Sequence, residues 1–116
     1  MKREIAMKWV KALRSGKYKQ GKSALVSVKD GGNCFCCLGV LAVEVLRKTP
    51  NELFGWGALS DGFANTATLG TSWGSQRNGG NLTIGGESYA SLAVANDFGA
   101  SFKQIATYIE KNYKKL

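Results

Sequence analysis

Apolar side chains recur every three or four residues near the start of the chain, which is the spacing of one face of an α-helix. The Ser15-Gly16 pair follows and is typical of a helix end. The pattern therefore predicts an N-terminal helix over residues 2–14, with one apolar face made by Ile5, Ala6, Trp9, Val10 and Leu13.

The next pattern predicts a β-hairpin and then a buried helix. β-branched residues in 24–28 and the run 34–37 flank the pair Gly31-Gly32, as expected for two strands joined by a tight turn. From Cys36 or Cys37 onward the sequence CLGVLAVEVLRK is apolar on nearly every side until Glu44, which is typical of a core helix. Thr49-Pro50 is expected to end it.

Residues 53–86 differ in composition from the rest of the chain. They contain nine glycines and only two charged groups, Asp61 and Arg77, but also several aromatic and aliphatic residues. The sequence Asn78-Gly79-Gly80-Asn81 lies between two short strand-like runs, so a second hairpin is predicted within 71–84 and ordered loop elsewhere.

Two helices are predicted at the end of the chain. Residues 89–97 have the pattern of a short helix closed by Gly99, and Ser101 opens the next helix with Gln104 as its capping-box partner. The expected buried stripe of that last helix is Phe102, Ile105, Ala106, Ile109 and Tyr113. No repeat or linker is found, so we predict one small α+β domain over residues 1–116: N-terminal helix, β-hairpin, buried central helix, Gly-rich hairpin and loop region, and C-terminal helix pair.

The positive charge of the chain is concentrated near its start. The formal net charge is +8, and residues 1–29 hold nine basic residues against one acid, Glu4, whereas residues 30–116 hold seven of each. Such an asymmetry attracts phosphates, nucleic acid or an anionic surface, although a solvated, solubilising face explains many charge runs equally well.

Several kinds of chemistry are disfavoured by what the sequence lacks. There is no histidine, which removes the usual general base and the commonest zinc ligand, and the eight acids are scattered. The only cysteines, Cys34, Cys36 and Cys37, lack a fourth Cys or His, so no metal site or other cofactor is predicted. A reactive thiol at a helix start is one interpretation of Cys36 or Cys37, and burial in the core is the favoured one. We expect a protein that is not an enzyme.

Gly39 leaves two interpretations open. A glycine here fits either a helix N-terminus that receives a phosphate or a close crossing by another element. The sequence around it, GNCFCCLGV, matches neither of the two glycine-rich nucleotide fingerprints, so the phosphate interpretation is weak.

The stretch RSGKYKQGK, residues 14–22, is the main candidate for ligand binding. Lysine and arginine suit phosphates, an aromatic ring suits stacking on a base, and a glutamine suits a base edge. Trp56 and Trp73 could complete such a site, although partial burial in the core is the favoured interpretation of each, because the ring is so apolar. The predicted ligand-binding residues are Arg14, Lys17, Tyr18, Lys19, Gln20 and Lys22, with Trp56, Trp73 and Arg77 from the low-charge segment.

The apolar runs are too short to cross a bilayer, and MKREIAMKWV lacks the apolar stretch of a signal peptide. The sequence therefore predicts a soluble, cytoplasmic protein that does not interact with membranes.

Three segments carry a resemblance: WVKALRSGKYKQGK (9–22), CFCCLGVL (34–41) and SLAVANDFGASFKQIATYIEKNY (91–113). Together they resemble a widespread family of small bacteriophage and prophage proteins, most of them without an assigned function. Small phage proteins of this general kind include oligomeric anti-CBASS sponges, which sequester the cyclic dinucleotide messengers of bacterial immunity. The resemblance does not extend to residues 53–86. It implies a homo-oligomer in the host bacterial cytoplasm.

The favoured hypothesis is therefore a phage-encoded, non-enzymatic protein that captures a cyclic or otherwise phosphate-bearing nucleotide. The first alternative is a nucleic-acid-binding protein whose N-terminal helix and loop follow a phosphate backbone. The second is an inhibitor that presents its basic helix to an acidic host protein.

Overall fold

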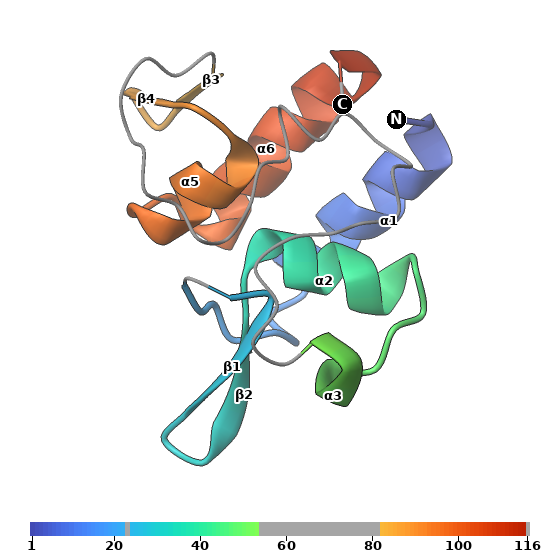
Figure 1. The fold of residues 1–116 in the computed structure, drawn as a ribbon. Coiled ribbons are helices and arrows are strands. Elements are labelled where there is room, and N and C mark those ends of the chain that lie inside the picture. The colour runs from blue at the N-terminus through green and yellow to red at the C-terminus, as the bar shows by residue number, and fades with distance from the viewer. Residues whose placement is uncertain (23, 54–81, 116) are drawn as a thin grey trace.

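Helices from opposite ends of the chain, α1 (Arg3–Arg14) and α6 (Phe102–Asn112), pack side by side in the computed structural model (Figure 1). The structure describes residues 1–22, 24–53 and 82–115. Each helix buries its apolar stripe against the common core, as amphipathic helices do. Ser15 closes α1 and the left-handed Gly16 (φ 77°) follows, which confirms the predicted first helix.

The helix α2 (Cys37–Glu44) is the core element of the domain. Residues 37–42 are buried, and the indole Nε1 of Trp9 on α1 donates a hydrogen bond to the Cys37 carbonyl at 2.8 Å. The helix ends well before the predicted Thr49-Pro50. Arg47 adopts a left-handed conformation (φ 59°), and the Lys48 amide donates to the carbonyl of Ala42 at 3.1 Å. Such left-handed closures usually use glycine or asparagine, so the sequence did not indicate this one. The short helix α3 (Pro50–Leu53) comes next.

The first hairpin is formed by β1 (Val26–Lys29) and β2 (Gly32–Phe35), which pair antiparallel with Lys29 opposite Gly32. Its two turn residues are Asp30 (φ 54°) and Gly31 (φ 79°), the combination that a tight two-residue turn favours. The hairpin is confirmed, with its turn one residue earlier than predicted. On the other edge of β2, the Phe35 amide donates a hydrogen bond to the Lys19 carbonyl, and the Phe35 carbonyl accepts one from the Gly21 amide.

A second hairpin is formed by β3 (Leu82–Ile84) and β4 (Glu87–Tyr89), joined by the left-handed Gly85 and Gly86. This turn was not predicted, and the hairpin predicted around residues 78–81 lies outside the described residues. Tyr89, predicted to be helical, is in β4 instead. The helix α5 (Leu92–Asp97) starts later because the Ser91 side chain caps it by accepting from the Val94 amide at 3.2 Å.

The last helix, α6, begins with the predicted capping box: Ser101 accepts from the Gln104 amide and the Gln104 side chain accepts from the Ser101 amide. It continues into the 3-10 turn Tyr113–Lys115. Helices and two small antiparallel strand pairs make this an α+β domain, as predicted. None of the helices in the described part of the chain has the length and apolar character needed to span a membrane.

Candidate functional site

Gly39 is a crossing point between α2 and the chain before β1. A Cβ atom added at Gly39 would lie 2.0 Å from the Leu25 carbonyl oxygen, far inside van der Waals contact. The structure therefore favours the close-crossing interpretation of this glycine over a phosphate site.

The three cysteines are buried, as the favoured interpretation predicted. The Cys36 thiol caps α2 by accepting from the Gly39 amide at 3.4 Å. Burial raises the pKa of the Cys37 thiol well above its usual value, which opposes the thiolate form that reactivity requires. Among the residues that the structure describes, no cluster of three or more Cys, Asp or Glu could hold a metal ion.

Three of the predicted cations are engaged with acids of the same chain. Arg14 pairs with Glu110 at 2.8 Å, and Lys17 with Glu44 at 3.5 Å. Lys19 lies 4.0 Å from the Asp30 carboxylate. These side chains are exposed, so a ligand would have to compete with each carboxylate for them.

Tyr18 does not fit its predicted stacking role. Its ring is buried and meets Phe35 edge-on, with centroids 4.9 Å apart and an interplanar angle of 79°. Its hydroxyl donates a hydrogen bond to the Glu44 carboxylate. Burial, and then the adjacent Glu44, raise the pKa of the Tyr18 hydroxyl, which therefore remains a donor at neutral pH. Tyr18 thus anchors residues 14–22, which we call the basic stretch, to the end of α2.

Gln20 does not fit its predicted role at a base edge either. Both hydrogens of its amide are used inside the protein, one on Asn96 Oδ1 at 2.9 Å and one on the Ala100 carbonyl at 2.8 Å. Asn96, fully buried in α5, also donates to the Gly21 carbonyl at 2.8 Å and accepts from the Cys37 amide at 3.1 Å. Asn96 thus fixes the course of the basic stretch. Trp56, Trp73 and Arg77 lie outside the described residues.

A cleft of about 360 Å³ opens between the basic stretch and the first hairpin. We call it the basic cleft; its lining is Gln20, Gly21, Lys22, Ser27, Val28, Lys29 and Cys34. Glycine is required at position 21 of this lining, because a Cβ there would lie 2.7 Å from the Cys34 Cβ. Lys22 and Lys29 are exposed like the three paired cations, but they form no ion pair with any residue that the structure describes.

Lys29 lines the cleft but is not among the predicted ligand-binding residues. The available signal was the alternation of a strand, because Ser27 and Lys29 are two residues apart and therefore lie on the same face of β1. Of the predicted residues, the structure brings Gln20 and Lys22 together in the basic cleft, while Arg14, Lys17, Tyr18 and Lys19 are not part of its lining.

The Glu44 contacts predict a pH-dependent contribution to stability. The Tyr18 hydrogen bond, and then Lys17, lower the pKa of the Glu44 carboxyl below its ordinary 4.5. A lowered folded-state pKa stabilises the protein above the unfolded-state pKa, and this contribution is lost as pH falls through the folded value. The stability difference between wild type and Glu44→Gln is therefore expected to shrink from about pH 6 to about pH 3, measured by urea unfolding.

Glu110→Gln is the matched control for this experiment, because Glu110 also pairs with a cation but is solvent-exposed. Exposed pairs are screened by water and salt, so a smaller pH-dependent difference is expected. If the stability difference between wild type and Glu44→Gln stays constant over the whole pH range, the contacts of Glu44 with Tyr18 and Lys17 are contradicted.

The structure thus defines a small α+β domain with a two-lysine cleft at its first hairpin. A family model described as "Domain of unknown function (DUF8296)" matches residues 1–57, slightly less than half of the chain. The chain is similar to that family from α1 to just beyond α3, a segment that includes the whole basic cleft. No curated protein and no solved structure matches the chain.

Proposed function

We propose that this protein is a phage-encoded, non-enzymatic binding protein that captures a phosphate-bearing nucleotide of the cyclic dinucleotide class in the basic cleft. By withholding the messenger from its receptor in the host cytoplasm, it would counter immune signalling of the bacterium. The observation that carries the proposal is the pair of exposed lysines, Lys22 and Lys29, that line one cleft and form no ion pair within the described residues.

The charge of the cleft suits a compact dianion. Two ammonium groups match two phosphates, and each charge-assisted contact is worth about 1.5 to 3 kcal/mol. The volume of about 360 Å³ is near the lower end of the usual range for small-molecule sites. One cleft therefore has room for part of a dinucleotide, and in this proposal a second copy of the chain covers the rest.

The direct test incubates the protein with a panel of cyclic dinucleotides and single cyclic nucleotides, and follows the melting temperature. The bound material is then released by heat and analysed. Release of intact ligand supports capture, whereas altered ligand indicates catalysis and contradicts the proposal. The absence of any melting shift across the panel also contradicts it.

The double variant Lys22→Glu/Lys29→Glu is expected to bind at least about 100-fold more weakly, since two contacts of about 1.5 kcal/mol or more are removed. Both side chains are exposed, so the melting temperature without ligand should change little. Lys48→Glu is the matched control, because Lys48 is exposed and lies outside the cleft. Retained binding in the double variant would place the site elsewhere.

Nucleic-acid binding remains the second candidate, because α1 exposes Arg3, Lys8 and Lys11 to solvent. Affinity for a nucleic acid that covers this helix should fall steeply with salt, by several powers of its concentration. A ligand with two phosphates should give a shallow dependence. A salt titration of binding therefore separates the two candidates.

A further inference from the structure

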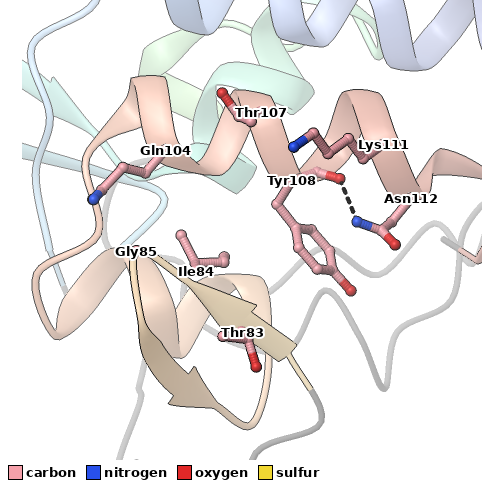
Figure 2. Close-up of a pocket in the computed structure, with 8 residues that line it drawn as sticks. All are labelled: Thr83, Ile84, Gly85, Gln104, Thr107, Tyr108, Lys111 and Asn112. Carbon is pink, nitrogen blue, oxygen red and sulfur yellow. Dashed lines mark hydrogen bonds between the residues drawn. The ribbon is translucent and has the colours of Figure 1, made fainter.

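A second hollow lies at the other hairpin, between β3–β4 and α6 (Figure 2). Its volume is about 490 Å³, larger than that of the basic cleft. We call it the α6 groove; its lining is Thr83, Ile84, Gly85, Gln104, Thr107, Tyr108, Lys111 and Asn112. None of these residues belongs to the segment that matches the family model.

The sequence builds the groove from one face of α6. Gln104, Thr107, Tyr108 and Lys111 are spaced by three, one and three residues, which places them on the same side of a helix. The opposite side carries the buried Ile105 and Ile109. Gly85 turns the hairpin in a left-handed conformation (φ 60°) next to Gln104, whose side-chain nitrogen would lie 2.5 Å from an added Cβ.

Some polar groups of the groove are occupied by local hydrogen bonds. The Thr107 hydroxyl donates to the Lys103 carbonyl at 3.0 Å, and the Asn112 side-chain nitrogen Nδ2 donates to the Tyr108 carbonyl at 2.9 Å. Within the described residues, the Tyr108 hydroxyl and the Lys111 ammonium have no hydrogen-bond or ion-pair partner. The groove thus offers one cation and one phenol to a ligand.

The Tyr108 ring gives the groove a surface that the basic cleft lacks. Figure 2 shows this ring extending from α6 toward the strand that carries Thr83 and Ile84. Tyr108 is only partly buried, and burial raises the pKa of its hydroxyl, so it stays a neutral donor. An aromatic ring suits the stacking of a flat heterocycle, and the Asn112 side-chain oxygen can accept a hydrogen bond from the edge of that heterocycle.

We infer that the α6 groove binds a mononucleotide: an aromatic base against Tyr108 and a single phosphate on Lys111. The charge count distinguishes it from the basic cleft, where two lysines suit two phosphates. The inference does not rest on the proposed function, because no residue is shared between the two sites.

The test uses the full-length ¹⁵N-labelled protein, titrated with adenosine and guanosine 5′-monophosphate, with ribose 5-phosphate as the base-free probe. At least one mononucleotide is expected to shift the amide resonances of groove residues such as Thr83 and Gly85. Ribose 5-phosphate should bind about tenfold or more weakly, because stacking on one ring is worth about tenfold or more in affinity.

Tyr108→Leu and Lys111→Gln are each expected to weaken mononucleotide binding by about tenfold. Lys103→Gln is the matched control on the same helix outside the groove, and Lys22→Glu should leave this binding unchanged. Melting temperatures establish that each variant is folded. Shifts confined to the basic cleft, equal binding of ribose 5-phosphate, or no shift at millimolar nucleotide would each overturn the inference, and the first would still support the proposed function.

Discussion

Gly39→Ala is expected to lower the free energy of unfolding by about 3 kcal/mol or more, the range of severe overpacking in a core. The added methyl group would lie 2.0 Å from the Leu25 carbonyl oxygen and 2.9 Å from the Leu25 carbonyl carbon. Both are backbone atoms, so relief requires α2 and the chain before β1 to separate. In an unobstructed helix the same change stabilises by about 1 kcal/mol, so the sign of the effect is diagnostic.

Urea unfolding followed by circular dichroism measures this change. The matched control is Gly32→Ala in β2, where the nearest atom to the added methyl group would be the Lys29 carbonyl oxygen at 3.9 Å. That variant is expected to stay within about 1 kcal/mol of wild type. An unchanged unfolding midpoint for Gly39→Ala would show that α2 and Leu25 do not cross as closely as the structure has them.

The parts of the fold that local sequence dictates were predicted correctly. The spacing of apolar residues in α1, the capping box of Ser101 and Gln104, and the first hairpin all depend on residues a few positions apart. Only the turn of that hairpin lies one residue earlier than predicted. Helix α2 was predicted because its sequence is apolar on nearly every side and therefore needs burial. Its early end was missed because Arg47 takes a conformation usually assigned to glycine.

The candidate site was less predictable because its side chains form hydrogen bonds with residues far away in the sequence. Tyr18 is held by Glu44, which is 26 positions away, and Gln20 by Asn96, 76 positions away. Composition identified a basic stretch correctly but could not show that three of its cations face carboxylates. Lys22 and Lys29 could be assigned to one site only once the hairpin had placed Lys29 beside the same cleft as Lys22.

Asn96 is the residue on which the placement of the basic stretch depends. Its side-chain oxygen accepts from Gln20 and from the amide of Cys37, the first residue of α2. Its nitrogen donates to the Gly21 carbonyl and to Asp97 Oδ1. One buried amide therefore joins the basic stretch, the start of α2 and α5, and satisfies a helix N-terminal amide that would otherwise lack a partner.

Asn96→Ala is expected to cost about 3 kcal/mol or more, because it leaves the buried Cys37 amide and the partly buried Gly21 carbonyl without their partner. It should also speed hydrogen exchange at the Gly21 and Phe35 amides, which link the basic stretch to β2. Urea unfolding and hydrogen exchange measure the two effects.

Gln20→Ala is the comparison for Asn96→Ala, because it removes one partner of the network and leaves the Asn96 bond to Cys37 in place. A smaller loss of about 1 to 2 kcal/mol is expected. In the double-mutant cycle the two residues should couple by about 1 kcal/mol, as directly bonded side chains do. A coupling near zero would contradict the bond between Gln20 and Asn96, and an Asn96→Ala variant as stable as wild type would mean that Asn96 does not hold the basic stretch. Lys22 would then be positioned by the bonds of Gly21 to Phe35 and of Gln20 to the Ala100 carbonyl.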